Sequence, residues 1–288
     1  MRWKVTDREG GEKLLDFLRK KYPDRSGKSI KRALDHRSCL LNGKLEMIAT
    51  TRLKSGDWVE CTVKEPLPCR NVQPLWEDED ILAVDKPSGI ACEPCTFAPH
   101  ILVHRLDKET SGVLLLAKNE AAFEALSQQF RNRSIHKEYL AVVEGHMPQE
   151  KGVIEVPLGK KSYIQGQTLY GPSRWGKSAT THWKCLQSTG GISLLSCKPV
   201  TGRTHQLRVH LQSIGHPIIG DALYGKQTFA KYEPPRLLLH ARRLRFYSRT
   251  ISEELEIIAP VAEELSLFLA QKGLHFGQGK GVEDIAFF

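Results

Sequence analysis

Short apolar runs with the composition of β-strands recur through the last three quarters of this 288-residue chain. They cover residues 81–84, 113–117, 139–143, 192–197 and 237–246. Each run is long enough to form a strand of a folded core. Because few helical segments lie between them, the chain is predicted to be an α+β protein with a large, mostly antiparallel mixed sheet flanked by helices.

Three helical patterns accompany these runs. Apolar residues three or four positions apart lie on one face of a helix, so each helix is expected to pack on the sheet. The predicted buried faces are Phe123, Leu126 and Phe130 after a cap at Asn119; Leu207, Leu211 and Ile214 between Thr204 and Gly215; and Leu265, Phe268 and Leu269 between Pro260 and Gly273.

The first 65 residues have a different pattern, and we predict that they form a separate small α+β domain. Two helical segments, over about 14–22 and 26–36, precede short strands around an Asn-Gly turn at 42–43. The predicted organisation is a domain over 1–65, a proline-containing linker over 66–73, a large domain over 74–272 and a tail over 273–288.

Positive charge is concentrated in two blocks of the chain, whose net charge is +9. Residues 1–64 contain 16 Lys/Arg against 9 Asp/Glu, and residues 156–220 contain 8 Lys/Arg and no acidic residue. Two basic blocks predict two contact zones for a polyanion such as nucleic acid, because neutralising phosphates supplies most of its sequence-independent affinity. The alternative is an ordinary solvated basic surface.

Other classes of protein are disfavoured by composition. No apolar run approaches the ~18 residues of a membrane span, and the first residues are charged, so a soluble, unexported, cytoplasmic protein is expected. Seven cysteines, an odd number, argue against a secreted disulfide framework. Cys92 and Cys95 have metal-ligand spacing but no second close pair. We therefore expect no metal. We also expect no cofactor, and a monomer is the default expectation.

The segment His104–Asn119, HRLDKETSGVLLLAKN, carries the candidate catalytic residue, Asp107. A Thr-Ser-Gly turn follows this carboxylate, and the apolar run after the turn is long enough for a buried strand. A charged side chain on a loop fixed by a core strand is well supported. The alternative is a surface aspartate in an ion pair with Arg105 or Lys108.

Five motifs in order resemble those of the RluA-type family of RNA pseudouridine synthases, over roughly residues 74 to 270. They are Val84–Gly89 (VDKPSG), the HRLD segment, Lys137–Gly145 (KEYLAVVEG), Gly202–His210 (GRTHQLRVH) and Leu238–Ala241 (LLHA). The resemblance implies an isomerase that converts uridine to pseudouridine in structured RNA. Only 14 residues separate Gly89 from His104, fewer than in many relatives, so the position of the target uridine is not expected to transfer from them.

The resemblance also implies roles for individual residues. Asp107 would be catalytic, and Tyr139 would lie against the uracil ring and help to remove its carbon-5 proton. Arg203 would pair with Asp107 and keep it ionised, with Arg208 as the competing candidate. Arg105 would enter the RNA stack where the target nucleotide is flipped out. Without the motifs, these residues would be a half-buried strand tyrosine and structural or phosphate-binding arginines.

Two groups of residues are candidates for RNA contacts outside the catalytic motifs. The amino-terminal domain resembles the small alpha-L RNA-binding domain, and its second helix region contains Lys28, Lys31, Arg32 and Arg37. The acid-free block interleaves cations with aromatic residues in a hairpin-like segment, the mixture expected for stacking on exposed bases. Its candidates are Lys160, Lys161, Arg174 and Trp175, beside Tyr163, Tyr170 and Lys177.

The candidate reactions differ in the number of catalytic carboxylates that they require. Ordinary glycoside hydrolysis needs two carboxylates, and only Asp107 is nominated here. Pseudouridine formation keeps its leaving group bound, so one carboxylate suffices, as a nucleophile toward sugar or base or as a base that removes a ribose proton. Large-subunit ribosomal RNA is favoured over transfer RNA as the target. The alternative function is a non-catalytic RNA-binding or ribosome-assembly factor.

Overall fold

The computed structural model describes residues 1–23, 25, 27–35, 38–63, 72–164, 167–274 and 276. The chain divides into two compact units, Met1–Leu67 and Pro68–Phe288. Of the predicted linker over 66–73, only Val72 and Gln73 are described, and most of the predicted tail over 273–288 lies outside the described residues.

The first unit consists of two helices and a four-stranded antiparallel sheet in the order β1-β4-β2-β3. Its elements are β1 (Arg2–Lys4), α1 (Leu14–Lys21), α2 (Gly27–Asp35), β2 (Cys39–Leu41), β3 (Lys44–Leu45) and β4 (Trp58–Cys61). Phe17 and Leu18 of α1 and Ile30 of α2 pack in one core with Val59 of β4. Asn42 and Gly43 have φ values of 52° and 76°, as the predicted tight hairpin turn requires.

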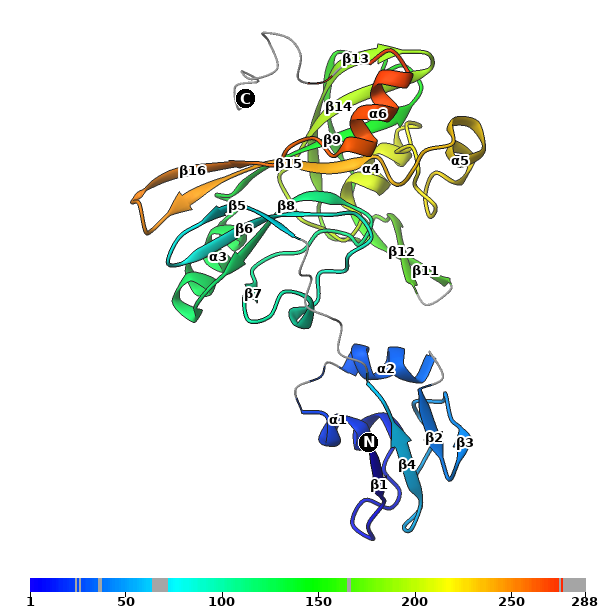
Figure 1. The fold of residues 1–288 in the computed structure, drawn as a ribbon. Helices are drawn as coiled ribbons and strands as arrows, with labels where there is room; N and C mark the ends of the chain where they lie inside the picture. The colour runs from blue at the N-terminus through cyan, green and yellow to red at the C-terminus, as the bar shows by residue number, and fades with distance from the viewer. Residues whose placement is uncertain are drawn as a thin grey trace. The chain divides into compact units, whose positions relative to one another are not determined.

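The second unit contains one ten-stranded sheet, a separate two-stranded hairpin and four helices among its described residues (Figure 1). Its elements are β5 (Gln73–Glu77), β6 (Ile81–Lys86), a 3-10 turn (Pro94–Thr96), β7 (Ile101–Leu102), β8 (Ser111–Ala117), α3 (Glu120–Asn132), β9 (His136–Glu144), β10 (Lys151–Glu155), β11 (Leu158–Ile164), β12 (Gln167–Pro172), β13 (Thr180–Thr189), β14 (Ile192–Pro199), α4 (Gln206–Ser213), α5 (Lys226–Tyr232), β15 (Leu239–Ser248), β16 (Glu253–Ile258) and α6 (Glu263–Gln271).

The large sheet runs in the order β10-β13-β14-β9-β15-β8-β6-β5, with β16 beside β15 and β7 beside β8. Among the described residues, every strand pairing of this sheet is antiparallel except β15 with β8. The predicted α+β class and the mostly antiparallel mixed sheet are therefore confirmed.

Helices cover both faces of the sheet. Because side chains alternate along a strand, Ala141 and Val143 of β9 face α4 and pack with Leu207, whereas Leu140 of β9 faces α6 and packs with Phe268. The helix α3 begins where predicted, since the Asn119 side chain accepts a hydrogen bond of 2.9 Å from the Ala122 N–H.

The parallel pair β8 and β15 joins segments about 130 residues apart in sequence. Gly112 of β8 has φ +107° and lies so close to the backbone of Ala241 that a Cβ atom would collide with it. The Ser111 hydroxyl and Nδ1 of His240 lie 2.9 Å apart in the interior beside this crossing. The segment that follows the Asp107 loop is therefore fixed against the LLHA motif.

One prediction of detail is wrong: Ile214 is expected to be buried by its helix, but it follows the last turn of α4 and is 38% exposed. The last helix, α6, lies within the predicted interval between Pro260 and Gly273 and buries Leu265, Phe268 and Leu269. Among the described residues, no helix is both long and apolar enough to cross a membrane.

Candidate active site

Asp107 lies on the short loop between β7 and β8. Leu106 is buried, and its N–H points at Sγ of Cys92 at 3.4 Å. The Asp107 carbonyl accepts a hydrogen bond of 3.1 Å from the Thr110 N–H, which closes a turn. These contacts fix the backbone on both sides of a carboxylate that remains 18% exposed.

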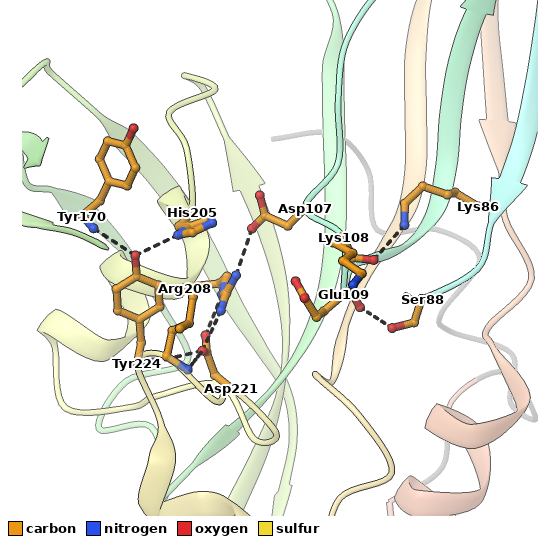
Figure 2. A network of polar contacts seen from close by, with 11 residues as sticks. Lys86, Ser88, Asp107, Lys108, Glu109, Tyr170, His205, Arg208, Asp221 and Tyr224 are labelled. Carbon is orange, nitrogen blue, oxygen red and sulfur yellow. Dashed lines mark hydrogen bonds and ion pairs between the residues drawn. The ribbon is translucent and has the colours of Figure 1, made fainter. Parts of the chain in front are cut away.

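Arg208, on the first turns of α4, is the ion-pair partner of Asp107 (Figure 2). Its Nη1 lies 3.5 Å from Oδ2 of Asp107. Its Nε and Nη2 donate hydrogen bonds of 2.7 and 2.8 Å to the two carboxylate oxygens of Asp221. Asp221 thus binds the guanidinium in a bidentate manner, and the remaining amine is directed at Asp107.

The prediction that Arg203 pairs with Asp107 is therefore wrong, and the competing candidate, Arg208, makes the contact. Arg203 lines the same cleft, but its Nε donates a hydrogen bond of 3.0 Å to the carbonyl of Ser178. The cause is local: α4 begins at Gln206, so Arg203 lies in the preceding turn while Arg208 lies on the inward side of the helix.

Asp221 and Tyr224 both contact the Arg208 guanidinium and fix its position. Oδ1 of Asp221 also accepts the N–H groups of Leu223 and Tyr224, at 2.9 and 3.0 Å. The Tyr224 ring lies 5.1 Å from the Arg208 guanidinium, and its hydroxyl accepts the Tyr170 N–H at 3.0 Å (Figure 2). This hydroxyl is also 2.8 Å from Nδ1 of His205.

Burial and the neighbouring negative charges shift the pKa values of Arg208 and His205 in opposite directions. Burial disfavours a charged Arg208, but the hydrogen bonds and negative charge of Asp221, together with Asp107, raise the pKa of the guanidinium above its usual value. Burial lowers the pKa of His205, although Asp107 favours its charged form. Arg208 is thus a permanent cation beside Asp107, whereas His205 is neutral at pH 7.

A cleft of about 300 Å³ surrounds Asp107. Tyr139, Lys137 and Arg105 also line it, together with the turn that precedes α4. Asp107 is the one carboxylate among the described residues that line this cleft. Burial, and to a smaller extent the charge of Asp107, raise the pKa of Tyr139, so its hydroxyl stays protonated.

Lys137 is a cleft residue that the sequence reasoning did not select. It lies on β9 two residues before Tyr139, on the same side of the strand, and burial lowers its pKa to about 8. Its position in the KEYLAVVEG motif was the available signal.

Lys86 lies beneath the Asp107 loop and is fully buried. Its ammonium donates hydrogen bonds to the carbonyls of Pro87, Ile90 and Lys108, at 2.9, 2.9 and 3.2 Å. Burial lowers the pKa of Lys86 to about 8, and the negative charges of Glu109 and Asp107 act in the opposite direction. The three carbonyls match the three donors of the charged ammonium. The Ser88 hydroxyl donates to the Glu109 carbonyl at 2.7 Å (Figure 2). Through Lys86 and Ser88, the VDKPSG motif thus fixes the backbone of the loop that carries Asp107.

The histidines of the motifs have structural partners. Nε2 of His104 accepts the Leu115 N–H at 2.9 Å, and burial lowers its pKa to about 3. His210 lies between the Thr181 hydroxyl and the Val156 carbonyl, both at 2.9 Å. Within the described ranges, no group of three or more His, Cys, Asp or Glu side chains has the arrangement of a metal site.

The other predicted RNA-contact residues of the large unit are exposed. Arg105 is exposed at the mouth of the cleft. Lys160 and Lys161 lie on the β11–β12 hairpin, which projects from the unit in Figure 1, and are exposed. Arg174 lies over the ring of Trp175 at 5.1 Å, and Trp175 is 85% exposed.

In the first unit, the predicted second helix is α2, which includes Lys28, Lys31 and Arg32 at helical spacing. Lys31 is exposed. The side chains of Lys28 and Arg32, and the whole of Arg37, lie outside the described residues.

The chain is similar in sequence and fold to several known proteins. Residues 80–213 match the family described as RNA pseudouridylate synthase. The chain is 31% identical over 292 residues to an uncharacterized RNA pseudouridine synthase, YlyB, of Bacillus subtilis (strain 168), covering 91% of this chain and 94% of the relative. It is 37% identical over 213 residues to ribosomal large subunit pseudouridine synthase C of Escherichia coli (strain K12), covering 66% and 67% of the two chains. The solved structure of human RNA pseudouridylate synthase domain containing 4 has 27% sequence identity and a TM-score of 0.60, and covers 71% of this chain and 94% of that one.

Proposed function

The chain belongs to the RluA-type family of RNA pseudouridine synthases, and we propose that it modifies specific uridines of large-subunit ribosomal RNA with Asp107 as its catalytic carboxylate. Members of this family are isomerases. The choice of ribosomal RNA over transfer RNA is supported by the name of the Escherichia coli relative, a ribosomal large subunit pseudouridine synthase.

One observation carries the catalytic assignment: Asp107 is the one carboxylate among the described residues of its cleft, and Arg208 is directed at it. A glycoside hydrolase places two carboxylates about 5 to 10 Å apart on either side of the scissile bond. The cleft offers one, which suits a reaction whose leaving group is retained and reattached.

The isomerisation breaks the bond from ribose C1′ to uracil N1 and forms a bond from C1′ to C5, after which the C5 proton leaves and N1 takes up a proton. Asp107 acts as a nucleophile toward sugar or base, or as a base toward a ribose proton, and these routes remain alternatives. In each route Arg208 orients the carboxylate and stabilises its charge.

Tyr139 and Arg105 act on the flipped nucleotide in this proposal. The Tyr139 ring stacks on uracil, and its protonated hydroxyl serves as a donor and a proton relay near C5. Arg105 fills the space that the nucleotide leaves in the RNA stack. Arg203, which lines the cleft without a contact to Asp107, binds the RNA backbone.

Contacts outside the cleft supply affinity for the RNA. The exposed cations and Trp175 of the β11–β12 region suit single-stranded bases and phosphates. In the first unit, Lys31 and the neighbouring cations of α2 suit phosphate contacts. Together they offset the few kcal/mol that base flipping costs.

The test compares ribosomal RNA from cells with and without the protein, treated with carbodiimide and read by primer extension. Cells that lack the protein are expected to lose a stop at particular uridines, and Asp107→Asn is expected not to restore it. Glu124→Gln, which neutralises an exposed carboxylate of α3, is the matched control and should restore the stop. Restoration by Asp107→Asn would mean that the chain acts as an RNA-binding factor or through another residue.

A further inference from the structure

A second cavity, a groove of about 600 Å³, lies on β9, β10, β13 and β14. No Asp or Glu is found among the described residues that line it. Its lysines and arginines are Arg133, Lys137, Lys151, Lys184 and Lys198, and two histidines accompany them. A concave surface with this charge attracts a polyanion.

The groove opens on the face of the sheet that also carries α6. Lys184 is opposite Ser196 in the strand register, and Ser196 is opposite Leu140. Leu140 packs against α6, and alternation along the strands directs Lys184 and Ser196 to the same face. Tyr139 and the catalytic cleft lie on the opposite face.

Nearby carboxylates only partly offset this charge. Oε1 of Glu138 accepts the Ser196 hydroxyl at 2.6 Å, while its Oε2 lies 3.4 Å from Nε of Arg243. Glu150 lies 3.9 Å from Lys184 and is itself 77% exposed. Burial lowers the pKa of Lys198; the charge of Glu138 opposes this shift, and the charges of Arg243, Arg245 and Lys184 add to it. The groove therefore keeps a net positive charge.

The groove and the catalytic cleft meet at the ends of two strands. Lys137, at the start of β9, and Pro199, at the end of β14, line both cavities. An RNA strand that leaves the cleft over Lys137 and Pro199 would enter the groove directly. Val153 is 51% exposed within it and supplies an apolar surface for sugar or base contacts.

From this arrangement we propose that the groove binds the RNA strand that flanks the target nucleotide, as this strand passes around the end of the sheet. The inference rests on the proposed function, because it requires an RNA substrate in the cleft. It assigns the groove to the phosphate backbone, which gives affinity for large RNA without reading its sequence.

The first experiment neutralises the groove with Lys151→Gln and Lys184→Gln together. The matched control is Lys226→Gln with Arg249→Gln, two exposed cations outside the groove. Each protein is given two transcripts that contain the target uridine: full-length large-subunit ribosomal RNA, and a hairpin limited to the target stem-loop. Binding is measured against salt concentration, and pseudouridine formation is measured on both transcripts.

The groove variant is expected to bind the long RNA about tenfold more weakly, with a salt slope smaller by about two, and to keep its kcat. Its binding to the hairpin should match that of the unchanged protein. The proposal is overturned if both RNAs are weakened equally, if neither is weakened, or if the control variant loses as much.

The second experiment separates failure of this inference from failure of the proposed function. A benzophenone amino acid placed at Val153 should crosslink to the long RNA on irradiation, whereas the same group at Ile251, another exposed aliphatic position, should not. If the unchanged protein forms no pseudouridine, the proposed function fails, and the crosslink still reports on the groove. Equal crosslinking at both positions, or none at Val153, refutes RNA as the occupant and favours an acidic protein segment.

Discussion

Arg208 and Asp221 form a bidentate ion pair in which both side chains are almost completely buried, with 3% and 0% exposure. The same guanidinium reaches Asp107 at the longer distance of 3.5 Å. Asp221 therefore sets the position of Arg208, and Arg208 in turn faces the carboxylate of the cleft.

Asp221→Asn is expected to lower kcat by about 10- to 100-fold with little change in KM. An amide keeps the acceptor for the Leu223 and Tyr224 N–H groups but loses the charge and one acceptor for Arg208, so the guanidinium is misplaced. Single-turnover kinetics on the target RNA measure this, and circular dichroism checks the fold. A rise in KM alone would show that Asp221 does not act through Arg208.

The two arginines of the GRTHQLRVH motif are expected to respond differently to lysine. Arg208→Lys loses the bidentate geometry with Asp221 and should reduce kcat by about 100-fold or more. Arg203→Lys keeps a cation at the cleft wall and should change kcat by less than about threefold. Equal losses in both variants would contradict the assignment of Arg208 as the partner of Asp107.

Tyr139→Phe separates the ring from its hydroxyl. If Tyr139 stacks on uracil as proposed, the phenyl ring keeps this contact and RNA affinity should persist, while loss of the hydroxyl should slow the reaction about 10²- to 10⁴-fold. Tyr139→Leu should also weaken binding by about 1 to 3 kcal/mol, because stacking is lost. Filter binding and release of tritium from carbon 5 of uridine measure the two effects, and normal tritium release by Tyr139→Phe would exclude a role for the hydroxyl.

RNA affinity is expected to fall as pH rises through about 8, the pKa to which burial lowers Lys137. Below this pH the ammonium is charged and attracts phosphate, and above it the neutral amine does not. Of the neighbouring cleft groups, the raised pKa of Tyr139 and the lowered pKa of His205 keep both uncharged between pH 7 and 9. Lys137→Arg should remove the pH dependence, which binding measurements over this range would reveal.

Lys86→Met is expected to lower the free energy of unfolding by about 3 kcal/mol or more, because three buried carbonyls lose their donor. Urea denaturation measures the change. Lys118→Met is the control: it removes a partly exposed ion pair with Glu77 and one hydrogen bond to the Asp78 carbonyl, and should cost about 1 kcal/mol. Similar losses in the two variants would show that Lys86 is not a structural support of the loop.

The strands that could be predicted from the sequence are those whose apolar runs form the centre of the sheet, such as β8, β9 and β14. The strand β13 was not predicted, because it mixes polar and apolar residues and its outer neighbour is the edge strand β10. Its stability comes from pairing with β14, a long-range contact that local composition does not record.

The site could be predicted from the sequence only in part, because some of its contacts depend on the tertiary structure. The motifs indicated which segments meet, and Asp107 and Tyr139 do line one cleft. They could not decide between Arg203 and Arg208, since that depends on where α4 begins. Asp221 lies in a loop without helical or strand periodicity, and its importance arises from burial against α4.

The crossing of Gly112 with Ala241 also bears on how the protein matures. Because the strand after the Asp107 loop is completed only by pairing with β15, a nascent chain that has not yet emerged past residue 241 lacks this support. Catalytic competence is therefore acquired late in synthesis, when most of the polypeptide has left the ribosome, and shorter translation products are expected to be inert.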